Sequence, residues 1–338
     1  MSLSLLTTCF PGLPDVDGSR VLGAAWVGAG APQEPPVWPQ QRLLTPVLGP
    51  AEVVQECWWV QGSAPLSCGE AEGIAWRRSG DLLFGVIDID EAAVRTEPPC
   101  TPLQQAAHDA YARIFHLLDA QGLPHLWRLW NYMADINGES HGLERYRQFN
   151  MGRGDAFEAG ARSVVGRVPA ACALGLAGGP LTVAFLAGAA PIVPVENPRQ
   201  VSAFLYPNRY GPRSPTFSRA ALAHPPGQEI LFVSGTASIV GHETVHPGDV
   251  RAQTVESLDN IAAVLGVASS SSRSGPFALA DLGYRAYIRH AADLPAVREV
   301  VAQRVGDAPV AYVRADVCRA DLLVEIEGQA LRKLPVWQ

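Results

Sequence analysis

The sequence predicts an α+β fold, an α/β sandwich made of two degenerate copies of one β-α-β-α-β-β unit, with the helices on one face of each sheet. Two observations support this. A strand, a loop and a long amphipathic helix recur in the same order about 150 residues apart, roughly one domain length. Hydrophobic residues make up 48% of the 338 residues and charged residues 17%, so the chain can bury a substantial core.

The first copy begins with an apolar strand at residues 81–89. A helix follows at 102–118, where apolar residues recur at helical spacing. An aromatic-rich strand is expected at 129–136, and a further helix comes after it. The copy closes with a pair of strands at 167–174 and 180–187.

The second copy repeats this order. Asp293 is expected to cap its second helix, because Pro295 stands just inside the helix start. The expected elements are strands at 230–240, 282–288, 312–318 and 321–328 and helices at 249–265 and 296–304.

These copies suggest three parts of the chain. Residues 1–190 form an N-terminal lobe with a Pro- and Gly-rich extension, and residues 229–338 form a C-terminal lobe that carries the chemistry. Residues 191–228 form a junction with a cluster of Tyr and Arg. Within the second lobe, the serine-rich segment 269–275 is expected to be a flexible loop.

Composition narrows the classes of function. A net charge of −7 and a pI near 5.6 argue against nucleic-acid and anionic-lipid partners. The start of the sequence lacks the basic segment of a secretory signal, and no apolar run of about 18 residues occurs, so we expect a cytoplasmic protein with no membrane partner. The six cysteines lack CxxC spacing, which disfavours zinc ribbons and a disulfide framework.

The last strands of the two copies differ in one informative way. Glu325 and Glu327 alternate with Val324 and Ile326, so the two acids share one face of their strand. In the first copy, Ala184 and Leu186 take the corresponding places. We therefore expect a functional site in the second copy only. The alternative is an ordinary amphipathic strand with its acids in water.

A basic cluster in the junction suits an anionic ligand. Guanidinium groups bind carboxylates in a bidentate manner, and tyrosine hydroxyls bind substrate oxygens. Residues 144–153 have a similar composition and include Arg147. The alternative for both segments is a solvated surface with ion pairs. The junction cluster contains Tyr206, Arg209, Tyr210, Arg213 and Arg219.

Two short motifs suggest other chemistry and are weaker. His242 to His246 has HExxH spacing, but Gly241 and Pro247 flank it and favour a loop, whereas zinc proteases need a helix there. Residues 138–142 match GxSxG, which is also an ordinary turn. GxGxxG and Walker A patterns are absent from the sequence, so no dinucleotide or P-loop fold is expected.

Several of these segments together resemble a known family. Residues 230–238, 248–265 and 323–327 resemble the YjgF/RidA superfamily. With residues 195–213 and 142–153, the chain more closely resembles the chorismatases, over most of residues 80–328.

The resemblance implies a mechanism. Chorismate is a dicarboxylate with an enolpyruvyl ether, and Glu325 would protonate the methylene carbon of that ether so that pyruvate is released. Burial beside Glu327 would raise the pKa of this acid. In one branch of the family a cysteine seven residues before the acid assists formation of 3-hydroxybenzoate, and Cys318 has this spacing. The resemblance thus implies that Glu325 and Cys318 are catalytic, that Tyr206, Arg209, Tyr210, Arg213, Arg147 and Arg314 bind substrate, and that neither metal nor cofactor is needed.

Three other functions remain open at this stage. The second branch of the family hydrolyses chorismate to a dihydroxycyclohexadiene carboxylate. A superfamily imine deaminase would release ammonia, and a binding protein would leave an aromatic acid unchanged. Members of the superfamily pack three units around an axis, so a homotrimer and a monomer are both consistent with the sequence.

Overall fold

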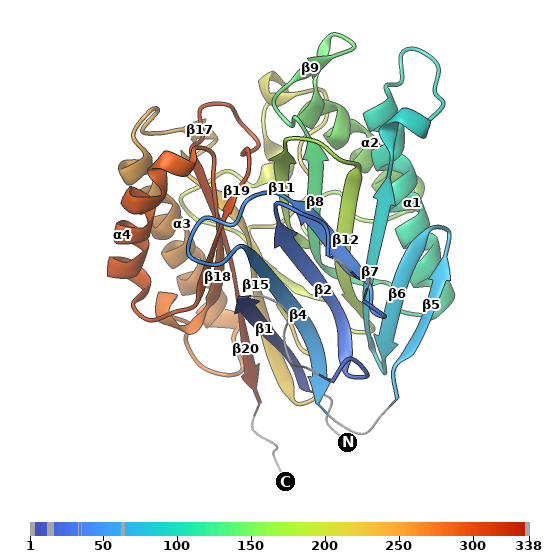
Figure 1. Cartoon of the computed structure of the whole chain (residues 1–338), viewed down its shortest axis with the longest axis horizontal. Helices are drawn as coiled ribbons and strands as arrows, with labels where there is room; N and C mark the ends of the chain where they lie inside the picture. The colour runs from blue at the N-terminus through green and yellow to red at the C-terminus, as the bar shows by residue number, and fades with distance from the viewer. Residues whose placement is uncertain (1–3, 12–16, 33, 35, 62–64, 335–338) are drawn as a thin grey trace.

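The structure is a computed structural model that describes residues 4–11, 17–32, 34, 36–61 and 65–334. Two six-stranded sheets stand between two pairs of helices, and a smaller sheet from the N-terminal region lies across them (Figure 1). The helices are α1 (Pro102–Gln121), α2 (Arg145–Ala159), α3 (Val250–Ser271) and α4 (Leu294–Val305). The predicted α+β class is confirmed.

The first six-stranded sheet has the order β11-β8-β12-β7-β6-β5, and the second has the order β13-β14-β15-β20-β18-β19. The strands of the first are β5 (Ser67–Ala71), β6 (Ile74–Ser79), β7 (Leu82–Ile89), β8 (His125–Ala134), β11 (Ala170–Leu176) and β12 (Leu181–Gly188). Those of the second are β13 (Val193–Val195), β14 (Ala220–Ala223), β15 (Gln228–Ala237), β18 (Gly283–Ile288), β19 (Val310–Arg314) and β20 (Val324–Lys333).

The same four-stranded arrangement occurs in both sheets. The order β11-β8-β12-β7 corresponds to β19-β18-β20-β15, and the outer pair is parallel in each case. This confirms the duplicated β-α-β-α-β-β unit. The two closing strands of the first copy are present but are not neighbours in the sheet, because β11 and β12 lie on opposite sides of β8. Helix α2 connects β8 to β11 and places β11 on the outer edge of β8. The other side of β8 then pairs with β12, which lies between β8 and β7.

Some predicted boundaries also differ. Helix α3 continues through Ser271, so the first part of the predicted loop 269–275 is helical. Ser269 donates a hydrogen bond to the carbonyl of Leu265, and the carboxylate of Glu229 accepts bonds from the residues just beyond the helix. Asp293 precedes α4 but makes no side-chain cap, because residues 291–293 already form a 3₁₀ turn.

The N-terminal region forms a separate sheet that covers the inner faces of both large sheets. Trp58 contacts Trp130 of the first sheet and Phe232 of the second, with ring centroids 5.7 and 5.9 Å apart. The order of this sheet is β1-β4-β2-β3. Its strands are β1 (Ser4–Pro11), β2 (Val21–Gly28), β3 (Gln40–Leu44) and β4 (Val53–Gln61).

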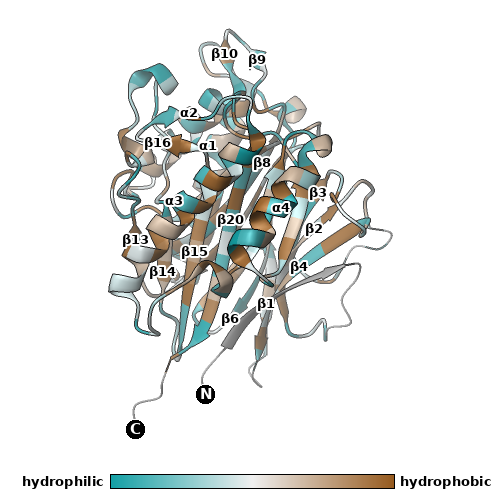
Figure 2. Cartoon of the chain, turned by 90° about the vertical axis from the view of Figure 1, so that its left-hand side faces the viewer, coloured by the Kyte–Doolittle hydropathy of each residue, from teal (hydrophilic) through white to brown (hydrophobic). Residues whose placement is uncertain are grey.

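Helices α3 and α4 cover the outer face of the second sheet (Figure 2), and α1 and α2 lie on the opposite side of the molecule, on the outer face of the first sheet (Figure 1). Val324 and Ile326 pack in the core beneath α3 and α4, so Glu325 and Glu327 face the first sheet instead. Ala184 and Leu186 lie in the apolar core between the sheets. Glu325 and Glu327 are 4% and 5% exposed, so the alternative of solvated acids is wrong.

None of the helices in the described ranges is both long enough and apolar enough to span a membrane.

Candidate active site

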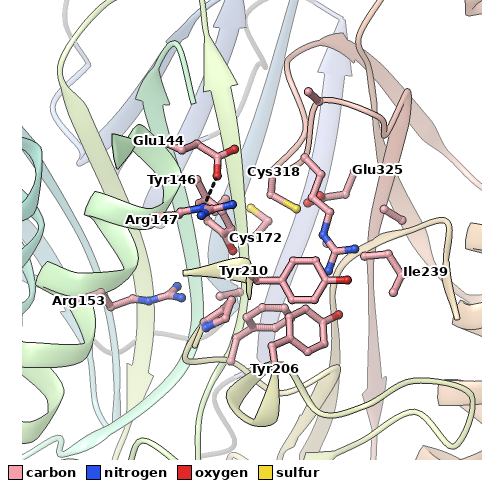
Figure 3. Close-up of a pocket in the computed structure, with 18 of the residues that line it drawn as sticks. Glu144, Tyr146, Arg147, Arg153, Cys172, Tyr206, Tyr210, Ile239, Cys318 and Glu325 are labelled. Atoms are coloured by element: carbon pink, nitrogen blue, oxygen red, sulfur yellow. Dashed lines mark hydrogen bonds and ion pairs between the residues drawn. The ribbon is translucent and has the colours of Figure 1, made fainter. Parts of the chain in front are cut away.

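A cavity of about 300 Å³ lies where the two units and the junction meet. Its wall includes the start of α2, the middle of β11, the segment before β14, the end of β15 and the loop before β20 (Figure 3). The polar groups come from segments far apart in the sequence, and only the packing of the two units brings them together. Such a concave, partly apolar space is typical of a site for a small molecule.

Glu325 is the acid in the wall of this cavity. Its carboxyl group lies against the backbone of β15: a Cβ atom on Gly235 would be 1.9 Å from Oε1 of Glu325. A β-bulge between Val233 and Thr236 shapes this part of the strand. Burial, and then the negative charge of Glu327, raise the pKa of Glu325 to about 8. Glu325 is therefore protonated at neutral pH and can act as a general acid.

Two thiols lie on the same side of the cavity as Glu325 (Figure 3). Cys318 precedes β20, and Cys172 belongs to β11. Burial and the nearby Glu325 raise the pKa of the Cys318 thiol to about 12, and burial also raises the pKa of Cys172. Both groups are thus neutral thiols at physiological pH, which suits a hydrogen bond or proton transfer rather than attack by a thiolate.

Arginine and tyrosine side chains form much of the remaining wall. Tyr206, Arg209, Tyr210 and Arg147 from the predicted set line the cavity. Arg147 is paired with Glu144 at 2.9 Å (Figure 3). Arg209 is paired with Glu243, and the hydroxyl of Tyr210 donates a hydrogen bond of 2.6 Å to the carbonyl of His242.

Three further arginines line the cavity and were absent from the predicted binding set. Arg153 and Arg219 are 1% and 5% exposed, and the guanidinium of Arg319 lies 4.1 Å from the ring centroid of Tyr210. The buried Nε of Arg153, Nε of Arg219 and Nη2 of Arg319 have no hydrogen-bond partner among the described residues. Since buried donors are normally paired, these groups are placed to receive an anionic ligand.

The sequence contains only partial indications that these three arginines line the site. Arg153 and Arg219 stand inside the two basic segments, but spacing alone did not separate them from their neighbours. Arg319 directly follows Cys318. Cys172 sits in an apolar strand, where nothing in the sequence distinguishes it from a core thiol.

Two residues of the predicted binding set lie elsewhere. Arg213 is on the surface, 3.0 Å from Asp155 and 2.7 Å from Glu158. Arg314 ends β19 and is exposed, on the face of that strand opposite Val313, which packs in the core between the sheets. Neither residue lines the cavity.

We therefore expect Arg213→Gln and Arg314→Gln to change kcat/KM for the substrate by less than about threefold, as for ordinary surface ion pairs. Steady-state kinetics of the purified variants test this. A loss of about 30-fold or more in either variant, with an unchanged melting temperature, would show that the residue reaches the substrate after all.

The two short motifs are also placed by the structure. His242 and His246 belong to a hairpin and its following turn, formed by β16 (Ile239–Val240) and β17 (Glu243–Thr244), as expected for a loop. The described residues contain no group of three or more His, Cys, Asp or Glu that could hold a metal ion. Ser140 lies on β9 (Glu139–Ser140), and its Oγ accepts a hydrogen bond from the amide of Gln148, which is not a general base.

These observations define the class of protein. A buried, protonated carboxyl group shares this cavity with guanidinium N–H groups that have no partner among the described residues. These are the features expected of an enzyme that acts on a small anionic substrate by general-acid catalysis.

Comparison with known proteins identifies the family. Residues 56–187 match the family described as "Chorismatase FkbO/Hyg5-like, N-terminal". The chain is 44% identical to a chorismatase of Streptomyces rapamycinicus and 39% identical to a 3-hydroxybenzoate synthase of Streptomyces hygroscopicus, over 82% of each chain. A crystal structure of a chorismatase superposes with a TM-score of 0.86 at 36% identity, covering 98% of this chain and 99% of the other. The chain belongs to the chorismatase family.

Proposed function

We propose that this protein converts chorismate to 3-hydroxybenzoate and pyruvate. The observation that carries the proposal is the protonated carboxyl group of Glu325 in a cavity lined by arginines. Glu325 donates its proton to the methylene carbon of the enolpyruvyl ether. The bond between the ether oxygen and the ring of the resulting oxocarbenium ion then breaks, and pyruvate leaves with that oxygen. The ring keeps its own hydroxyl oxygen and gives up a proton as it becomes aromatic, so substrate and products balance without water. A neutral acid is essential for this step, because a carboxylate has no proton to give.

The arginines suit the two carboxylates of chorismate. Arg153, Arg219 and Arg319 each present a buried N–H group without a partner in the described structure, and a carboxylate would satisfy these donors. With both of its carboxylates bound, the substrate would keep its vinyl ether near Glu325. The protein would thus bring the reacting groups together without a cofactor. The hydroxyl of Tyr206 already accepts a hydrogen bond of 2.8 Å from Arg219, so it orients that guanidinium.

The proposal is tested by incubating the protein with chorismate and separating the products. Pyruvate with 3-hydroxybenzoate supports it. Pyruvate with a dihydroxycyclohexadiene carboxylate would assign the chain to the hydrolytic branch, and absence of pyruvate would reject chorismate as the substrate. Ammonia release from 2-iminoacids, measured in parallel, would indicate the imine deaminase activity instead.

The thiol of Cys318 favours 3-hydroxybenzoate as the product, because a neutral S–H group beside Glu325 can take part in proton transfer during aromatisation. A Cys318→Ala variant is expected to keep releasing pyruvate but to shift the products away from 3-hydroxybenzoate. Chromatography of the products measures the ratio, with Cys68→Ala, an exposed thiol outside the cavity, as the matched control. An unchanged ratio in Cys318→Ala would remove the thiol from the product-determining step.

A further inference from the structure

The two acids on the inner face of β20 have very different surroundings. Glu327 accepts a hydrogen bond from Arg128 on one oxygen and a bond of 3.0 Å from the hydroxyl of Tyr287 on the other. Arg285 lies 3.7 Å from the second oxygen. Within the described part of the chain, no hydrogen bond or ion pair joins Glu325 to another side chain. Glu327 therefore has polar partners on both of its oxygens, whereas Glu325 has none among the described side chains.

The partners of Glu327 are themselves fixed. Arg128 and Arg285 are 2% and 3% exposed, and Arg285 is also paired with Glu56 of the N-terminal sheet at 2.8 Å. The hydroxyls of Tyr132 and Tyr287 lie 2.5 Å apart, and Arg285 donates to both. Each charged group in this cluster therefore lies beside a group of opposite charge.

We propose that Glu327, fixed in place by Arg128 and Tyr287, is a positioning residue whose charge adds to burial in keeping the neighbouring Glu325 protonated for catalysis. Glu327 does not line the cavity, so it acts through Glu325 and not on the substrate. Alternate residues of a strand are about 6.6 Å apart along the chain. At that separation in a buried site, a fixed negative charge strongly disfavours a second one, as in pairs of carboxylates that share a single proton. This role rests on the proposed function, because only acid catalysis requires a neutral Glu325.

None of the other groups around Glu325 places an uncompensated negative charge beside it. Burial raises the pKa values of Cys172, Cys318 and Tyr146, so these groups are neutral. Arg128 and Arg219 are cations and favour the ionised form of Glu325. Glu144 also lines the cavity, but Arg147 neutralises it. The titratable and charged groups around Glu325 in the described structure include Glu327 on β20, Arg128 on β8, Cys172 on β11, Cys318 before β20, Arg219 before β14 and Tyr146 on α2. Tyr287 lies directly opposite Glu325 on β18, and burial raises its pKa, so it is neutral as well.

The test is a Glu327→Gln substitution, followed by the pH profile of kcat with chorismate. In the wild-type protein, kcat is expected to be constant at low pH and to fall above about pH 8 as Glu325 loses its proton. Removing the charge at Glu327 lowers the pKa of Glu325, so the fall should begin at least about one pH unit lower. On the acidic plateau, where Glu325 is protonated in both proteins, kcat should remain close to wild type.

Two further variants separate this role from a structural one. Glu56→Gln also removes a buried carboxylate from an arginine, but Glu56 is on the N-terminal sheet, so the melting temperature should fall while the pH profile stays unchanged. The double variant Arg128→Gln/Glu327→Gln removes a balanced pair and tests the idea even if Glu327→Gln does not fold. The pH at which kcat of the double variant decreases should lie between the values for Glu327→Gln and the wild type.

The titration of Glu325 can also be followed without substrate, by NMR of protein labelled at the glutamate side-chain carboxyl carbon and assigned with Glu325→Gln. A wild-type titration pH in both Glu327→Gln and the double variant would overturn the proposal, as would an equal shift in Glu56→Gln. If the pKa of Glu325 shifts as expected but chorismate yields no pyruvate, the proposed function is wrong, while the electrostatic coupling between Glu327 and Glu325 is supported.

Discussion

A Glu325→Gln variant is expected to lose pyruvate release from chorismate by about 10²–10⁴-fold, the usual contribution of a general acid. Glutamine has nearly the same shape and keeps the close contact with Gly235, but it has no acidic proton. Because neither the volume nor the packing changes, the melting temperature should stay near that of the wild type. A coupled assay for pyruvate measures the loss, and calorimetry with chorismate should show that binding is retained.

Glu299→Gln is a suitable control for this experiment. Glu299 is half exposed on α4, far from the cavity lining, and is paired with Arg251. Its replacement should leave pyruvate release unchanged. If Glu325→Gln kept more than about a tenth of wild-type kcat, another group would have to supply the proton, and the assignment of Glu325 as the acid would be wrong.

An Arg153→Gln variant is expected to lower kcat/KM for chorismate by about 10- to 100-fold, the effect of losing a hydrogen bond to a charged group. Arg153 is buried on α2, and no carboxylate within the described chain forms an ion pair with it. Its charge is therefore available to the ligand. In contrast to Glu325→Gln, much of the loss should appear as weaker binding, which steady-state kinetics and calorimetry both detect.

Arg304→Gln is the matched control for Arg153→Gln. Arg304 lies on α4 and is paired with Asp259 of α3, on the outer side of the second sheet. We expect no change in kcat/KM for this variant. If Arg153→Gln also had wild-type kcat/KM while its fold was intact, the substrate carboxylates would have to bind to the other arginines of the cavity.

The repeated fold could be predicted from the sequence because both units rely on local patterns. The helices carry apolar stripes, and Thr101 and Asp249 cap the two long ones. The lateral order of the strands could not be predicted in the same way. It depends on where a helix returns the chain to the sheet edge, and the sequence around β12 and β20 does not encode that position locally.

The site was partly predictable for a related reason. Glu325 stood out because alternation fixed its face and the first unit has apolar residues on that face. Arg213 stands close to Arg209 in the sequence, but in the structure it lies on the surface beside Asp155 and Glu158. Arg153 lines the same cavity as Glu325 and Cys318, which lie far from it in the sequence, so its place depends on how distant parts of the chain come together.

The sheet that Trp58 anchors has a consequence for folding. The inner faces of both large sheets share one apolar core with it, so a unit that separated from the rest would expose that core to water. We therefore expect that neither half of the chain can fold alone with its apolar core shielded from water. Heating should melt the two units and the N-terminal sheet in a single cooperative transition. Truncation at the boundary between the units should yield two insoluble fragments.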